Sequence, residues 1–174
     1  MQNKFSYPLK LEDISTHTKT YNITANADEL QEIAQILKVP EIKSFKALIN
    51  IKLDKPNHLV TLNGNLSSDV VQISVISLEP FTKNYNIDFK RIYDTTITPQ
   101  EQLEMENLSD INDDVPEAME NKQIDLAAIA TEALALELDN FPRKKDETFS
   151  FQPDFDIYED KPESPFSVLN NLKK

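Results

Sequence analysis

The feature that most constrains the fold is a two-residue alternation of side chains between residues 45 and 53, in which every second position is hydrophobic. This period is typical of a β-strand with one buried and one exposed face. Asp54–Lys55–Pro56–Asn57 follows and has the composition of a turn, because proline presets its backbone angle and asparagine tolerates unusual ones. The alternation predicts a long half-buried strand that ends in a reversal. Its buried positions are Phe45, Ala47, Ile49, Ile51 and Leu53.

Other β-prone segments lie on both sides of this strand. The expected strands cover residues 5–11, 19–23, 58–66, 70–78 and 85–92. Ser67–Ser68–Asp69 is interpreted as a turn, and Glu79–Pro80 as an interruption. Four successive strands joined by short turns favour an antiparallel meander, which could curl toward a barrel.

Two helices are expected. Asn26 with Glu29 has the spacing of a capping box, hydrophobic residues follow at 30, 33, 34 and 37, and Pro40 ends the pattern. An alanine-rich stretch after Asp125, a plausible cap, predicts a second helix that ends before Pro142. Together with the strands, these segments predict an α+β fold with two main helices.

The acidic residues are unevenly distributed. Residues 1–91 carry 11 basic and 10 acidic side chains, whereas residues 92–121 carry nine acidic side chains and no basic one. We expect residues 94–121 to form an acidic flexible loop within a single domain of residues 1–142. A docking surface for a basic partner is the alternative interpretation. Residues 143–174 are expected to form a partly ordered, extended tail whose aromatic side chains dock on the domain or on a partner.

The composition argues against most catalytic chemistry. The chain has no cysteine, and its single glycine, Gly64, rules out glycine-rich phosphate loops and marks a bulge or a close backbone approach. His17 and His58 are far apart in sequence, and Asp110, Asp113 and Asp114 lack the glycine of a calcium loop. We expect no catalytic residue, no metal, no cofactor and no small-molecule substrate. Without a signal peptide or a run of 18 apolar residues, the expected location is the cytoplasm, away from membranes.

The stretch VVQISVISLEPF, residues 70–81, resembles the central signature of the YceD family of large ribosomal RNA subunit accumulation proteins. A second block, from the start of the alanine-rich helix to a proline followed by basic residues, is similar to the next family segment. Pro165–Phe166, Leu169 and Leu172–Lys173 resemble its closing segment. The candidate signature or interaction positions are Gly64, Gln72, Leu78, Glu79, Pro80, Asp125, Leu126, Glu132, Pro142 and Arg143.

One departure from the family concerns cysteine. Many members carry cysteines at positions that correspond to Ser74 and Ser77. Because both residues are serine here, this chain cannot have a metal-binding or redox role that uses those cysteines. Placed three residues apart in a strand, these two serines should point to opposite faces.

The resemblance implies a bacterial accessory factor for the accumulation or processing of large-subunit (23S) rRNA, with no established catalytic residues. Such a factor would bind a ribosomal protein, an assembly factor or the rRNA itself. The acidity of the chain favours a protein partner, because negative charge repels phosphates and matches lysine-rich surfaces. The alternatives are an acidic protein-interaction adaptor unrelated to ribosomes and, third, a metal-dependent nuclease.

Overall fold

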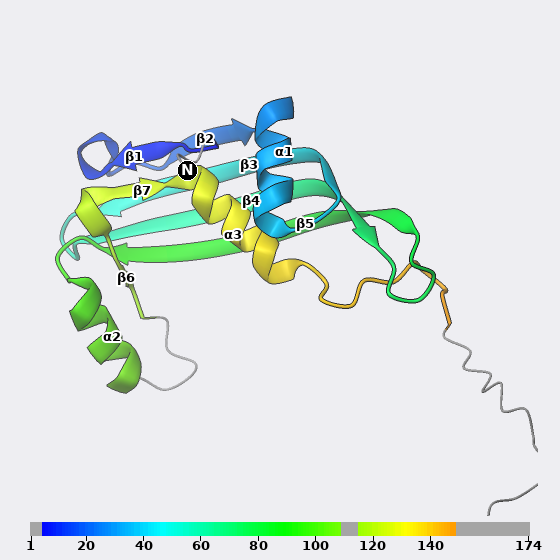
Figure 1. The fold of residues 1–174 in the computed structure, drawn as a ribbon. Coiled ribbons are helices and arrows are strands. Elements are labelled where there is room, and N and C mark those ends of the chain that lie inside the picture. The colour runs from blue at the N-terminus through cyan, green and yellow to red at the C-terminus, as the bar shows by residue number, and fades with distance from the viewer. Residues whose placement is uncertain (1–4, 109–114, 149–174) are drawn as a thin grey trace, which may run out of the picture.

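The structure is a computed structural model that describes residues 5–108 and 115–148. Its main sheet has the strand order β2-β3-β4-β5-β6 (Figure 1). The strands are β2 (Lys19–Thr24), β3 (Glu41–Asp54), β4 (Leu59–Ile73), β5 (Pro80–Asp94) and β6 (Glu117–Ala118). Strands β2 to β5 form an antiparallel meander, and β6 pairs in parallel with β5. The α+β fold with an antiparallel meander is therefore confirmed.

Two more strands and three helices complete the described fold. β1 (Pro8–Lys10) and β7 (Gln123–Asp125) pair as a second, two-stranded antiparallel sheet. The helices are α1 (Ala27–Leu37), α2 (Pro99–Leu108) and α3 (Leu126–Glu137). Short 3-10 helices lie at Leu11–Asp13 and Glu120–Lys122, so the strand expected at 5–11 is shorter than predicted. None of the described helices is long and apolar enough to cross a membrane.

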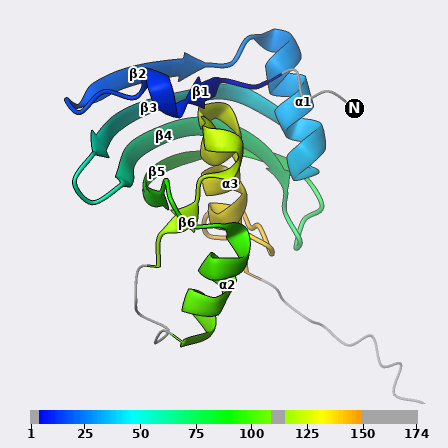
Figure 2. The same ribbon diagram turned by 90° about the vertical axis from the view of Figure 1, so that its left-hand side faces the viewer.

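The main sheet is open. Its strands curve around α3, but within the described residues β2 and β6 remain the two edges, so the sheet is not closed into a barrel (Figure 2). α1 and α3 pack on one face, which carries the buried side chains, and no described helix covers the other face.

The alternation in β3 determines which face is buried. Phe45, Ala47, Ile49 and Ile51 are at most 2% exposed, as the period of two predicts. They share one hydrophobic core with residues of α1 and α3, among them Ile33, Leu126 and Leu134.

Both predicted helix caps are confirmed. The Asn26 side chain accepts hydrogen bonds from the backbone N–H groups of Asp28 and Glu29, and the Glu29 carboxylate accepts one from the Asn26 N–H at 2.7 Å. Asp125 caps α3 in the same way by accepting from Ala127 and Ala128. α1 ends at Leu37, and its C-cap Lys38 has a left-handed backbone (φ 55°) two residues before Pro40.

The turn predicted at Ser67–Asp69 is wrong, because β4 runs through it to Ile73. The polar side chains of this segment form hydrogen bonds across the sheet, whereas in a turn they would be hydrated by solvent. The buried Ser68 hydroxyl donates to the Ser44 carbonyl at 2.8 Å, and the Asp69 carboxylate accepts from the Ser44 hydroxyl and from Asn84. The chain reverses only after Ile73, so the strand expected to reach Leu78 ends five residues earlier.

The loop predicted over residues 94–121 is wrong for the residues that form α2 and β6. α2 buries no side chain, so it lacks the hydrophobic period by which helices are recognised. Residues 109–114 of the predicted loop and residues 149–174 of the predicted tail lie outside the described residues. Residues 143–148 of the tail are described and lie against the loop between β4 and β5.

Candidate functional site

The ten candidate positions do not form one site. Six of them lie at the end of the sheet where β4 turns into β5 and the chain leaving α3 runs alongside: Gln72, Leu78, Glu79, Pro80, Pro142 and Arg143. The other four are spread along the fold. Gly64 lies in the middle of β4, Asp125 and Leu126 start α3, and Glu132 lies within α3.

Residues 74–79 form a tight loop, which we call the β4–β5 loop. The fully buried Ser74 hydroxyl accepts hydrogen bonds from the N–H groups of Ile76 (3.1 Å) and Ser77 (3.3 Å). The Ser74 N–H donates to the Glu79 carbonyl, and the Leu78 N–H donates to the Ser74 carbonyl. Leu78 adopts a left-handed backbone (φ 59°) and is 76% exposed. The Leu-Glu-Pro signature therefore encodes a turn whose leucine faces solvent.

The segment after α3, residues 142–147, is attached to this loop. The Val75 N–H donates to the Pro142 carbonyl at 2.9 Å, and the Lys144 ammonium pairs with Glu79. The Ser74 hydroxyl donates to the carboxylate of Glu147. Hydrogen bonds from Ser74 and then Ser77 hold the pKa of Glu147 below its usual range. Two signature blocks far apart in sequence thus meet here, although Arg143 itself is exposed.

The expectation that Ser74 and Ser77 point to opposite faces of a strand is wrong. The chain has already left β4 at Ile73, and the turn brings both hydroxyls to one carboxylate, that of Glu147. The spacing of the two serines could not predict this arrangement, because the prediction assumed that the strand continued to Leu78.

The attachment of Glu147 should depend on pH. Its pKa is lowered in the folded protein, so the attachment is complete above the ordinary glutamate range and is lost as the pH falls through the lowered pKa. A titration of the Val75 amide signal by NMR should therefore have its midpoint below that ordinary range. Ser74→Ala removes the largest cause of the shift and should raise the midpoint, whereas Ser67→Ala, on the exposed face, should not. An unchanged midpoint in Ser74→Ala would contradict this assignment.

Gln72 has a structural position. Its side-chain carbonyl accepts from the Tyr85 hydroxyl at 2.7 Å, and its amide donates to the Asp139 carbonyl at 3.4 Å. Gln72 is 4% exposed and so joins β4, β5 and the end of α3 from inside. Gly64 is equally structural, because a Cβ atom there would lie 2.2 Å from the Phe89 ring across the strands. The predicted close approach is confirmed, and Gly64 pairs in register without a bulge.

Glu132 belongs to an ion-pair cluster between α3, β5 and β6. Arg91 lies 3.0 Å from Glu132 and 3.4 Å from Glu117. Burial raises the pKa of Glu117, and Arg91 offsets part of that shift. Burial also raises the pKa of the Tyr93 hydroxyl. These ion pairs attach β6, which lies within the acidic segment of residues 94–121, to β5 and α3.

α2 (Pro99–Leu108) projects beyond the edge of the sheet (Figures 1 and 2). We call this helix the acidic arm. Glu101, Glu104 and Glu106 lie on this helix, together with the exposed Leu103 and Met105, which are 58% and 40% exposed. The helix is connected to β6 through the Ala118 N–H, which donates to the Gln102 side chain at 2.6 Å. The arm therefore combines negative charge with accessible hydrophobic side chains.

Sequence reasoning missed α2, although a signal for its start was present. Thr98 and Glu101 form a capping box around Pro99, which is favoured as the first residue of a helix. The Thr98 N–H donates to Glu101 at 2.7 Å, and the Glu101 N–H donates to the Thr98 hydroxyl at 3.3 Å. These hydrogen bonds lower the pKa of Glu101.

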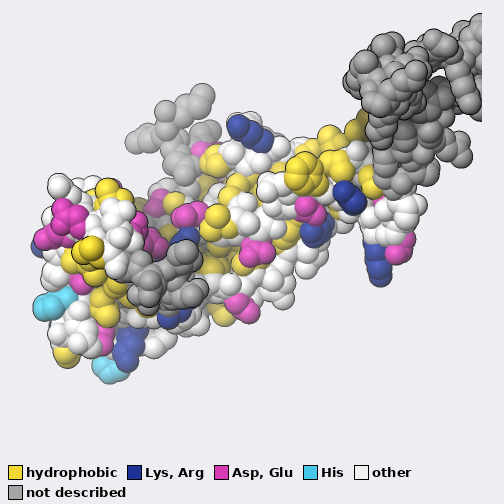
Figure 3. All heavy atoms as spheres, turned by 90° about the horizontal axis from the view of Figure 1, so that it is seen from below, with side chains coloured by type: hydrophobic (Ala, Val, Ile, Leu, Met, Phe, Trp, Pro, Cys, Tyr) yellow, Lys and Arg dark blue, Asp and Glu magenta, His cyan; other side chains and the backbone are white. Residues whose placement is uncertain are grey.

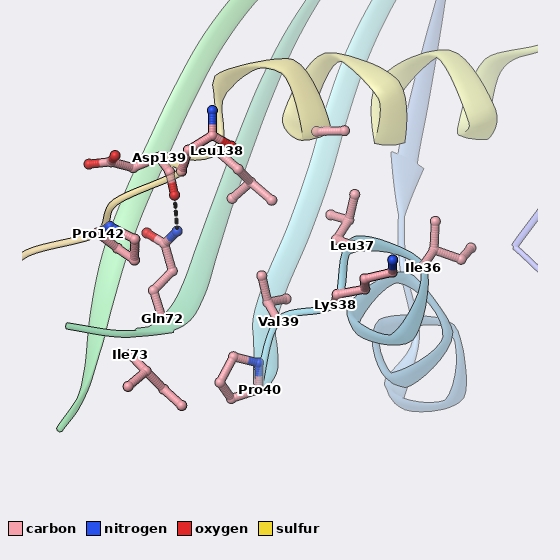
Figure 4. Close-up of a pocket in the computed structure, with 12 residues that line it drawn as sticks. Ile36, Leu37, Lys38, Val39, Pro40, Gln72, Ile73, Leu138, Asp139 and Pro142 are labelled. Atoms are coloured by element: carbon pink, nitrogen blue, oxygen red, sulfur yellow. Dashed lines mark hydrogen bonds between the residues drawn. The ribbon is translucent and has the colours of Figure 1, made fainter. Parts of the chain in front are cut away.

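The described residues hold no group of three or more His, Cys, Asp or Glu side chains that could bind a metal ion. His17 and His58 are both exposed. This part of the chain instead presents three surfaces: the acidic arm, the polar outer face of the sheet, and a groove near the β4–β5 loop that is lined by both hydrophobic and polar residues (Figure 4).

Comparison with known proteins gives one match. The family model described as "Large ribosomal RNA subunit accumulation protein YceD" matches residues 62–173, which is more than half of the chain. The match begins within β4 and includes the β4–β5 loop, the acidic arm and α3. No curated protein and no solved structure matches the chain.

Proposed function

The chain belongs to the YceD family, and we propose that it is a non-enzymatic factor that supports the accumulation of large-subunit (23S) rRNA by binding a basic ribosomal protein or assembly factor. The family match ties the chain to large-subunit rRNA accumulation. The partner is inferred from charge. One observation carries that part of the proposal: the acidic arm, a helix without a buried residue that projects from the sheet.

The chemistry of the arm favours a protein partner. Lysine- and arginine-rich surfaces are attracted to its carboxylates, and the exposed Leu103 and Met105 can contact apolar side chains once the two surfaces meet. An RNA backbone would be repelled by the same charges. The outer sheet face carries Lys46, Lys52 and Lys90 but also Asp69 and Asp88, so its charge does not favour phosphates strongly.

Depletion and rescue test the proposal. Depletion of the protein from bacterial cells should lower large-subunit rRNA relative to small-subunit rRNA, and the wild-type chain should restore the ratio. The combined replacement of Glu101, Glu104 and Glu106 with glutamine should restore little of it, because the partner is attracted by charge. Gln keeps the side-chain shape and the capping role at 101.

The matched control neutralises three exposed acids elsewhere: Glu12→Gln, Asp13→Asn and Glu137→Gln. This variant has the same net charge as the arm variant and should rescue the ratio fully. In parallel, affinity purification of the full chain after ribonuclease treatment should retain a basic large-subunit protein that the arm variant loses. A partner that ribonuclease removes would move the proposal from a protein to RNA, and equal rescue by both variants would refute the arm as the binding surface. An unchanged rRNA ratio on depletion would refute the ribosomal role.

A further inference from the structure

The two edges of the main sheet differ in how well they are protected against pairing with another strand. One edge is β2, and the other is β5 with the short β6 at its end (Figure 1). Proline and charged side chains on an edge discourage the addition of a strand. β5 has both, because it starts at Pro80 and the part that β6 leaves unpaired carries Lys83, Asp88, Lys90 and Arg91. Charged side chains of both signs are accordingly visible on this side of the molecule (Figure 3).

β2 lacks this protection. Its sequence is KTYNIT, so it contains no proline, and its single charge is Lys19 at the first position. Tyr21 and Ile23 are buried in the core, while the residues between them and beside them are exposed. Threonine, tyrosine and isoleucine favour strands. Within the described residues β2 pairs with β3 only, so its other side is open to a further strand.

The hydrogen-bond pattern shows which backbone groups of β2 face away from the sheet. The Ala25 N–H donates to the Phe45 carbonyl at 3.1 Å, which continues the β2–β3 ladder by one pair. Hydrogen-bonded and non-hydrogen-bonded pairs alternate in an antiparallel ladder, so the odd-numbered residues of β2 bond to β3. The N–H and C=O groups of Thr20, Asn22 and Thr24 therefore point outward, and no hydrogen bond to them is formed within the described residues.

We propose that β2 pairs with β2 of a second copy of the chain, antiparallel and about a two-fold axis at Asn22. In this register the three residues with outward backbone groups pair only with one another. Asn22 lies opposite the second copy's Asn22, and Thr20 lies opposite the second copy's Thr24. On the core side Tyr21 lies opposite the second copy's Ile23, an aromatic and β-branched pair of the kind that stabilises sheets. The two main sheets then form one continuous sheet.

The charges at the two ends of β2 fit a second copy. Within one copy the Lys19 ammonium lies over the Tyr21 ring, and Asp13 attracts it without forming an ion pair. Asp28, in the first turn of α1, is exposed and also has no ion pair within the described residues. Antiparallel pairing places Lys19 opposite the second copy's Ala25, three residues before Asp28. The two-fold axis repeats this contact, so opposite charges meet at both ends of the strand pair.

A pair of six-residue strands is a small interface, so the dimer should be weak. Sedimentation velocity of the full chain, from micromolar to millimolar concentrations, should show a shift from monomer to dimer. Amide hydrogen exchange on the same samples should slow at Thr20, Asn22 and Thr24 as the concentration rises. This inference depends neither on the ribosomal role nor on the acidic arm, which projects from the opposite edge of the sheet.

A charge exchange at Asn22 tests the register. Asn22→Lys places two lysines opposite each other across the axis, and Asn22→Asp places two aspartates there. Like charges directly opposite each other destabilise a strand pair, so each variant alone should raise the dissociation constant of the dimer by roughly fivefold. An equal mixture of the two variants should recover at least the wild-type affinity, because lysine then lies opposite aspartate.

The matched control makes the same changes at Asn63, which is exposed on β4 in the middle of the sheet. Asn63→Lys, Asn63→Asp and their mixture should all keep the wild-type dissociation constant. Three outcomes would overturn the proposal. They are a wild-type chain that stays monomeric at every concentration, a dimer that the Asn22 variants do not weaken, and a weakened dimer that mixing does not recover.

Discussion

Replacement of Leu126 with alanine is expected to lower the free energy of unfolding by about 3–4 kcal/mol. Leu126 is fully buried in the first turn of α3 and belongs to the core that joins this helix to the sheet. The loss combines the transfer free energy of the removed atoms with the cost of the cavity that remains. Urea unfolding followed by circular dichroism measures it.

Leu48→Ala is the matched control for this prediction. It makes the same chemical change at a residue that is 43% exposed on the outer face of β3, and it should cost less than about 1 kcal/mol. Similar losses at the two positions would contradict the assignment of Leu126 to the core. The free energy of unfolding of a native protein is about 5–15 kcal/mol. A Leu126 variant that fails in cells because it unfolds therefore has to be distinguished from a variant that folds but does not bind its partner.

This distinction applies to most of the candidate positions. Gln72, Gly64 and Leu126 are signature residues whose surroundings explain them as parts of the fold. Leu78 and Arg143, in contrast, are exposed and remain available to a partner. A resemblance based on sequence motifs cannot separate these two groups, because a motif records which residue is present and not whether its side chain is accessible.

The parts of the fold that could be predicted depend on local signals. Asn26 and Asp125 cap helices through contacts within three residues, and the alternation in β3 is an internal property of that strand. The failures depend on distant partners. Ser68 and Asp69 have turn chemistry, but Ser44, 24 and 25 residues away, forms hydrogen bonds with both of them, and β4 continues through these positions.

The candidate site was less predictable than the fold for the same reason. The pairing of Ser74 with Glu147 joins residues 73 positions apart, and that of Lys144 with Glu79 joins residues 65 apart. Neither pair has a spacing that a local pattern could reveal. The groove is also invisible in the sequence, because its lining comes from the ends of three elements.

Asp125→Ala is expected to have the second largest effect, a loss of about 2 kcal/mol in the free energy of unfolding. The Asp125 carboxylate accepts two sets of hydrogen bonds. Its Oδ1 atom accepts from the N–H groups of Ala127 (3.0 Å) and Ala128 (3.3 Å) and so caps α3. It also accepts from the Tyr7 N–H at 2.8 Å, while Oδ2 accepts from the Ser6 hydroxyl at 2.6 Å.

The comparison with Asp125→Asn distinguishes hydrogen bonding from charge. Asparagine caps helices about as well as aspartate and retains the acceptor at Oδ1, so it should lose less than about 1 kcal/mol. Hydrogen exchange should show faster exchange at the amides of Tyr7, Ala127 and Ala128 in the alanine variant only. If both variants lost the same stability, the charge would be the main contribution. The result would also show how far β1, which lies outside the residues matched by the family model, depends on Asp125, which lies within them.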